Sequence, residues 1–343
     1  MPHKTFLAFI LPSIIAMVLF IALPIVSVAV QSLYVEHGKV LVEVESCQPL
    51  GGCTKQTVVD NEATAKLEAA EPLGQFNGLG TYFNHSHLAS AEVAEIFSSN
   101  TGIGDIAARL YNLPFYRALA FTLAYCFLVT PLAMALGFVI ALTVNMVPRL
   151  LKGPVIFFSL LPMIITPLVG SLILYWMISS EGILGVALKW LFNDPTLSLK
   201  ASPVLTWVTL IVYGIWTNAP FSFVVFYAGL QTVPGDTLES AMIDGASRWE
   251  RIRYVVMPHL APLATFVALV QLMVNFRVFE PIVGFSAQAN ATSLSFSIFN
   301  DLRNQNAQLY GSAATTSMLT IIGVVILLMP VLVRTWREFN SKS

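Results

Sequence analysis

Six long, uncharged stretches of apolar residues divide the sequence, and segments rich in polar positions separate them. They run over Thr5–Val35, Ala118–Pro148, Gly153–Ser180, Ala201–Gly235, Tyr254–Phe276 and Asn304–Val333. Each is long enough for a helix that crosses about 30 Å of hydrocarbon, which takes roughly 20 apolar residues. The pattern predicts six transmembrane helices. The first is a retained helix, because its apolar part is too long for a cleaved signal peptide and no clear small-residue cleavage site follows it.

The composition strengthens this interpretation. The chain is 56% hydrophobic and 11% charged, with a mean hydropathy of +0.74, whereas soluble domains average about 45–50% apolar and 25% charged residues. A net charge of −1 offers no basic excess for binding nucleic acid. The three cysteines form no metal-type cluster with histidine, and Cys126 lies in an apolar run, where it acts as a small hydrophobic residue.

Lysine and arginine are densest in the short segments that lie on the side of the N-terminus, such as Arg149–Lys152 and Arg248–Arg253. Positive charges near span ends favour the cytoplasmic side. We therefore expect both termini to be cytoplasmic.

A large polar insertion follows the first predicted helix. Within it, Cys47 and Cys53 are close enough in sequence to close a small loop in an oxidising compartment, although spacing alone does not fix the geometry that a disulfide needs. The pattern divides the chain into a first transmembrane helix at 1–35, a periplasmic insertion at 36–113, a five-helix core at 114–335 and a cytoplasmic tail at 336–343.

The segment Gln231–Pro258, between the fourth and fifth runs, is charged and shows helix signals. Asp236 stands three residues before Glu239, and Ser247 stands three residues before Glu250, as in two capping boxes. Gly245 between them suits the left-handed residue that ends a helix. The segment thus predicts a helix, a glycine turn, a second helix and then Pro258 at the start of the fifth span. These signals alone fit an amphipathic loop on the bilayer as well as a docking surface.

The same segment resembles a known motif. The residues Gly229-Leu230-Gln231-x-Val233-Pro234, then Glu239-x-Ala241-x-x-Asp244-Gly245-Ala246-Ser247 and then Pro258 are similar to the EAA loop of binding-protein-dependent ABC importer permeases, above all those of the maltose-type carbohydrate-uptake branch. Phe76-x-Gly78-Leu79-x-x-Tyr82 resembles the stretch before the next span in that family. Ser240 and Met257 depart from the usual Ala and Leu, and Ala287-Gln288-Ala289-Asn290 replaces a Gly-Gly-Pro.

The resemblance implies an all-α membrane protein with the six-helix fold of a type I ABC importer permease, located in a bacterial inner membrane. It implies that the loop at 231–258 docks on a separate ATPase. The docking core would comprise Glu239, Ala241, Asp244, Gly245 and Ala246. The chain has no phosphate-binding Gly-x-x-x-x-Gly-Lys-Ser/Thr loop, so ATP and Mg are expected on the partner and no cofactor on this chain.

Alignment to the family also implies a substrate path. Thr217, Asn218, Phe221 and Asn275 fall on positions that line the sugar site in maltose-type permeases, although polar groups in helix bundles commonly bond to neighbouring helices instead. Arg277 is a further candidate, because charges inside or near spans are costly and are functional candidates by default. It stands three residues before Glu280, so the two are alternatively a structural pair on one helix face.

The function that follows is import of a carbohydrate, with this chain as half of the pore. The expected partners are a second permease subunit, two ATPase subunits, a periplasmic substrate-binding protein and the lipid bilayer. The alternative is an ion-driven secondary transporter, a class that often shows internal repeats and buried acidic relays; no clear repeat is visible here. A membrane-embedded enzyme would need a catalytic constellation within the spans, and the sequence offers none.

Overall fold

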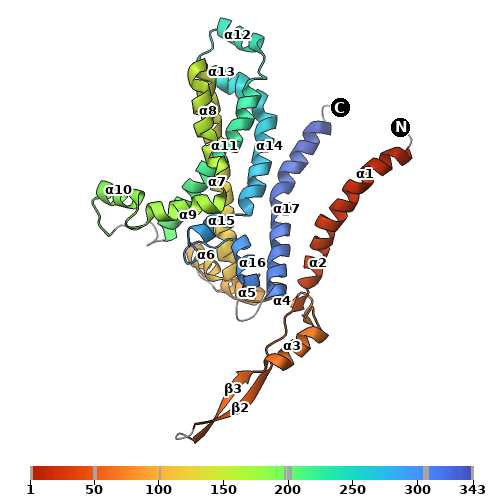
Figure 1. Ribbon diagram of the computed structural model, residues 1–343. Helices are drawn as coiled ribbons and strands as arrows, with labels where there is room; N and C mark the ends of the chain where they lie inside the picture. The colour runs from red at the N-terminus through yellow and green to blue at the C-terminus, as the bar shows by residue number, and fades with distance from the viewer. Residues whose placement is uncertain are drawn as a thin grey trace. The chain divides into compact units, whose positions relative to one another are not determined.

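Among the residues that the computed structural model describes, five single helices are long and apolar enough to cross a membrane: Phe9–Gln31, Pro114–Met146, Pro203–Leu230, Arg248–Phe276 and Tyr310–Val333. They coincide with five of the six predicted spans (Figure 1). The structure describes residues 3–48, 52–99, 102–196, 198, 203–303 and 309–340. The predicted span starts at Ala201 and Asn304 lie outside these residues.

The third predicted span is not one straight helix. It consists of α8 (Arg149–Ile164) and α9 (Pro167–Ile178), which meet at an angle of 95°. Thr166 between them is extended, with φ −62° and ψ 140°, because a residue before proline is pushed out of the helical region. The continuous run Gly153–Ser180 therefore forms a bent pair, and the span count is six only when this pair is counted as one span.

At two other prolines, Pro24 and Pro258, the helix continues without a break. A π-helical segment, Val18–Ala22, joins α1 (His3–Met17) to α2 (Leu23–Gln31) two residues before Pro24. A second one, Ile252–Val256, joins α13 (Arg248–Arg251) to α14 (Met257–Phe276) two residues before Pro258. The amide N–H of the residue before each proline bonds the carbonyl five residues back, at Val18 and Ile252. This wider turn relieves the clash that a proline ring makes with the preceding turn of an α-helix.

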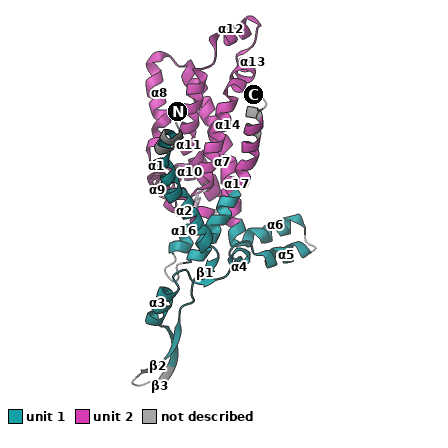
Figure 2. Cartoon of the chain, turned by 90° about the vertical axis from the view of Figure 1, so that its right-hand side faces the viewer, with its two compact units in different colours: residues 1–116, 297–323 teal, residues 117–296, 324–343 magenta. Residues whose placement is uncertain are grey.

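The chain forms two compact units (Figure 2). The first comprises Met1–Tyr116 with Ser297–Gly323, and the second comprises Arg117–Phe296 with Val324–Ser343. The long helices α7 (Pro114–Met146) and α17 (Tyr310–Asn340) contribute to both.

The first unit contains the insertion, which folds as two small sheets and short helices. Strands β2 (Leu41–Gln48) and β3 (Gly52–Val59) form an antiparallel hairpin that sets the backbone of Cys47 opposite that of Cys53. Their disulfide stays a prediction. The remaining elements are β1 (Tyr34–Val35), which pairs with β4 (Gln75–Phe76), α3 (Asn61–Ala70), α4 (Gly80–Phe83), α5 (Ser90–Ser98) and α6 (Ile103–Asn112).

A buried histidine ties together the parts of this unit that are distant in sequence. The His87 ring is fully buried and contacts Asn84 Oδ1 at 2.7 Å and the carbonyl of Ser312 at 3.1 Å. The Ser312 hydroxyl in turn donates to Asp301 at 2.7 Å. Burial lowers the pKa of His87 and raises the pKa of Asp301. The network holds the segment after α4 against the start of α17.

The second unit is organised around α11 (Pro203–Leu230), which packs against α8, α14 and the short α15 (Glu280–Gly284). Two apolar clusters fill it. One includes Phe121, Leu210 and Phe285, and the other includes Val144, Phe223 and Leu260. Its other helices are α10 (Ile183–Phe192), α12 (Gly235–Ile243) and α16 (Leu294–Arg303), the last of which extends into the first unit.

Helices α9 and α15 pack closely against each other at Gly284. A Cβ at Gly284 would overlap the Ser171 hydroxyl oxygen and would lie 3.1 Å from the carbonyl oxygen of Leu168. Ser171 is fully buried, and its hydroxyl donates to that same carbonyl at 2.8 Å and to the carbonyl of Glu280 at 3.3 Å. Only glycine allows this contact.

We expect Gly284→Ala to lower the midpoint of thermal unfolding of the detergent-purified protein, because overpacking costs about 1–3 kcal/mol. Gly153→Ala on α8 is the control, since no atom lies within 4 Å of its added Cβ. The double variant Ser171→Ala/Gly284→Ala should recover part of the loss. Equal midpoints for Gly284→Ala and Gly153→Ala would contradict the packing described here.

Candidate functional site

The segment predicted to dock on a partner forms an exposed helical excursion between α11 and α14. Helix α12 begins at Gly235, with Pro234 as its N-cap residue and no side-chain cap. The predicted capping box at Asp236 and Glu239 is therefore wrong. Pro234 already fixes an extended backbone before Gly235, which starts the helix one residue before the Asp236 side chain can act as a cap.

The C-terminal end of α12 follows the prediction. Gly245 has φ +81°, the left-handed conformation that glycine adopts most easily. The amide of Ala246 bonds the carbonyl of Ala241 at 2.9 Å, and the amide of Gly245 bonds the carbonyl of Met242 at 3.1 Å. This pair of bonds is the Schellman motif. It satisfies the last carbonyls of α12 and reverses the chain within two residues.

The second predicted capping box is confirmed at Ser247. Its hydroxyl accepts from the amide of Glu250 at 3.3 Å, and the Glu250 carboxylate accepts from the amide of Ser247 at 2.7 Å. The helix that starts here does not end at Pro258, as the sequence suggested. It runs on through the π segment into the fifth span, so that Arg248–Phe276 is one helix.

The surface of this excursion is open. Glu239, Asp244 and Gly245 are exposed, and Ala241 and Ala246 are half-buried. A Cβ at Gly245 would meet no atom within 4 Å, so its small size serves the backbone conformation and not internal packing. Ile243 is 87% exposed and Trp249 65% exposed. Small residues, acidic groups and exposed apolar side chains together form a surface that suits contact with another protein.

The residues predicted to line a substrate path lie on α11 and at the end of α14, two helices that pack together. Thr217, Asn218 and Phe221 are half-buried on α11, next to Pro220. The Thr217 hydroxyl donates to the carbonyl of Tyr213 at 3.1 Å, and the Asn218 amide donates to the carbonyl of Gly214 at 2.8 Å. Both side chains therefore fold back along their own helix in this state.

Gln271 is a residue that sequence reasoning missed. It lies on α14, is 1% exposed, and its side-chain nitrogen donates to the Asn218 carbonyl at 2.9 Å and to the Ser222 hydroxyl at 2.7 Å. Its Oε1 is buried and makes no hydrogen bond within the described part of the chain. An unpaired buried acceptor is costly, so this amide is a candidate for a group that meets a ligand. The available signal was its position in a mostly apolar run, one helical turn before Asn275.

Asn275 and Arg277 differ sharply in their surroundings. Asn275 is 2% exposed, and its amide donates to the Thr130 hydroxyl of α7 at 3.0 Å. Arg277 is exposed and caps the C-terminus of α14. Because α14 ends at Phe276 and α15 starts at Glu280, Arg277 and Glu280 share no helix face. The salt bridges between described residues do not include this pair, which contradicts the predicted structural pairing.

A polar seam therefore runs between α11, α14 and α7. It comprises Thr130, Asn218, Ser222, Gln271 and Asn275. Within the residues that the structure describes, no group of three or more His, Cys, Asp or Glu side chains is arranged to hold a metal ion. The side chains gathered here are amides and hydroxyls, which both donate and accept hydrogen bonds.

Comparison with known proteins identifies the family to which the chain belongs. The family described as "Binding-protein-dependent transport system inner membrane component" matches residues 100–338. The probable ABC transporter permease protein YesP of Bacillus subtilis is 28% identical over 237 residues, 67% of this chain and 75% of that protein. The trehalose/maltose transport system permease protein MalF of Thermococcus litoralis is 30% identical over 154 residues, 44% of this chain and 47% of that protein.

A solved structure shares the fold. It is the crystal structure of a bacterial ABC transporter involved in the import of the acidic polysaccharide alginate, with a TM-score of 0.60, 20% identity, and coverage of 80% of this chain and 95% of the matched chain. The match confirms the type I ABC importer permease fold. With a family match over most of its length and five spans plus a bent pair, this chain is a multi-pass membrane protein that belongs to the inner membrane components of binding-protein-dependent transport systems.

Proposed function

We propose that this permease imports a carbohydrate and is driven by a separate ATPase that docks on α12 and α13. The observation that carries the proposal is the exposed helix α12 with its Schellman turn at Gly245, formed by the residues that match the EAA loop. The names of the relatives support the cargo class, since one carries trehalose and maltose and the similar structure imports a polysaccharide.

Docking assigns roles to the residues of the excursion. Glu239 and Asp244 offer exposed carboxylates to basic groups on the ATPase, Ala241 and Ala246 keep the surface small enough for a close approach, and Gly245 sets the backbone of the turn. ATP and Mg are bound and used on that partner. The proposal therefore has α12 facing the cytoplasm, with both termini in the same compartment.

The polar seam is the proposed substrate contact. Asn218 and Gln271 present amide groups, which donate and accept at once and therefore suit sugar hydroxyls. Thr217, Phe221, Asn275 and Arg277 complete the proposed path. Asn275 reaches the substrate only by releasing Thr130. A second permease supplies the other half of the pore, a second ATPase completes the motor, and a periplasmic binding protein delivers the cargo.

The importer itself is tested by ATPase activity of the complex reconstituted in proteoliposomes with its binding protein, measured against a panel of sugars and polyols. We expect stimulation by one class of compound. If no ATPase copurifies with the permease under conditions that keep it folded, the proposal fails.

Substitution of Gly245 tests docking. Gly245→Val forces a β-branched residue into the left-handed region, at a cost of about 1–2 kcal/mol or more, and should greatly reduce copurification of the ATPase. Gly245→Asn is the matched control, because asparagine tolerates that conformation. Wild-type ATPase yield with Gly245→Val would show that the turn is not part of the docking surface.

A pair of variants distinguishes a substrate-binding role of Asn275 from its hydrogen bond to Thr130. Thr130→Val and Asn275→Leu both remove the hydrogen bond between α7 and α14, so both should lower the unfolding midpoint by similar amounts. Only Asn275→Leu should also weaken the sugar dependence of ATPase stimulation, by about 3- to 10-fold for one lost hydrogen bond. The same sugar dependence in both variants would make Asn275 a packing residue alone.

A further inference from the structure

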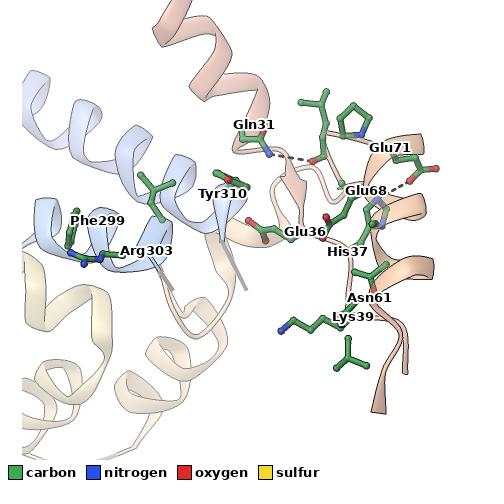
Figure 3. Close-up of a pocket in the computed structure, with 17 residues that line it drawn as sticks. Gln31, Glu36, His37, Lys39, Asn61, Glu68, Glu71, Phe299, Arg303 and Tyr310 are labelled. Atoms are coloured by element: carbon green, nitrogen blue, oxygen red, sulfur yellow. Dashed lines mark hydrogen bonds and ion pairs between the residues drawn. The ribbon is translucent and has the colours of Figure 1, made fainter. Parts of the chain in front are cut away.

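A pocket of 920 Å³ lies within the first unit and shares no residue with the polar seam. One wall comes from the chain after β1 and from α3, and the opposite wall comes from α16 and the start of α17 (Figure 3). The volume falls within the range of about 300–1,000 Å³ that is usual for small-molecule sites. Among the lining residues are Glu36, Lys39, Asn61, Glu68, Phe299 and Arg303.

The pocket wall is held in place by contacts within the unit. Glu36 accepts from the amide of Gly311, which joins the chain after β1 to α17. Gln31 donates to the carbonyl of Leu73 at 3.3 Å. Arg303 stacks over the Phe299 ring at 5.6 Å. These contacts fix both walls without filling the space between them.

His37 is a buried polar side chain at the pocket wall whose ring nitrogens lack hydrogen-bond partners among the described residues. It lines the pocket with only 3% of its side chain exposed. Its Nε2 lies 3.3 Å from a Glu71 carboxylate oxygen, yet neither ring nitrogen makes a hydrogen bond within the part of the chain that the structure describes. Buried polar atoms in folded proteins almost always have a hydrogen-bond partner, and such an exception at a pocket wall points to a ligand.

Three further side chains are available to that ligand. Lys39, Asn61 and Glu68 line the pocket and make no side-chain hydrogen bond or ion pair that the described residues show. Together they offer a cationic donor, an amide that both donates and accepts, and an anionic acceptor. Figure 3 shows them on the same side of the pocket, opposite the Phe299 and Arg303 pair.

We infer that this pocket, between the insertion and the α16–α17 segment, is a carbohydrate-binding site that is distinct from the proposed path through the spans. Hydroxyl groups donate and accept at once, so a sugar satisfies the mixed lining of Lys39, Asn61 and Glu68, whereas a simple ion satisfies only one sign of charge. No group of three or more potential metal ligands occurs among the described residues. The choice of a sugar rests on the proposed function; the pocket itself does not.

The experiment is isothermal titration of the full-length permease in lipid nanodiscs with maltose, maltotetraose and an alginate tetrasaccharide. At least one saccharide should bind, and the double variant Asn61→Ala/Glu68→Gln should raise its Kd at least tenfold. Lys39→Ala should weaken binding, while Lys55→Ala should leave it unchanged. Lys55 is the matched control because it is an exposed lysine of the same unit, outside the pocket.

Gln271→Leu separates this site from the polar seam, because it should leave the pocket affinity unchanged. The inference is overturned if none of the three saccharides binds. It is also overturned if Gln271→Leu abolishes binding while the pocket variants bind as the wild type does. Copurification of the ATPase is measured on the same samples, so that a failed pocket is distinguished from a failed importer. Unfolding midpoints equal to that of the wild type exclude misfolding of the variants.

Discussion

In hydrocarbon, every backbone amide and carbonyl needs a partner within the protein, because no water is there to replace a lost bond. Prolines inside the long helices test this rule repeatedly, at Pro131, Pro220, Pro262 and Pro330. The chain meets it in two further ways. At Pro24 and Pro258 the helix widens to a π turn, and at Pro167 it breaks and restarts at 95°. The arrangement of the spans depends on which solution each proline takes.

Sequence rules that consider only neighbouring residues predicted the features that neighbouring residues determine. Run length gave five spans, Gly245 gave the helix end, and Ser247 gave the second helix start. The break at Thr166 escaped prediction, because proline alone does not break a helix: Pro131 and Pro220 lie inside continuous ones. The failed capping box at Asp236 has a similar cause, since the sequence pattern does not show that Pro234 starts the helix first.

The candidate site shows more clearly what could not be predicted from the sequence. Resemblance supplied Asn218 and Asn275, but Gln271 gains its meaning from Asn218 and Ser222, about 50 residues away on another helix. The pocket in the insertion depends on a contact between Glu36 and Gly311, 275 residues apart. The alternative pairing of Arg277 with Glu280 is contradicted because α14 ends at Phe276, before both residues, and α15 starts only at Glu280. Such facts come from tertiary packing, which no spacing rule contains.

The unbroken helix from Arg248 to Phe276 has a mechanical consequence. At 1.5 Å per residue, its 29 residues form a rod of about 44 Å, with the capped end at Ser247 beside the Gly245 turn and the far end beside Arg277. A displacement at one end is delivered to the other as a tilt of the whole rod, and not lost in a flexible connector. The π turn before Pro258 keeps this rod continuous, because it accommodates the proline without breaking the helix.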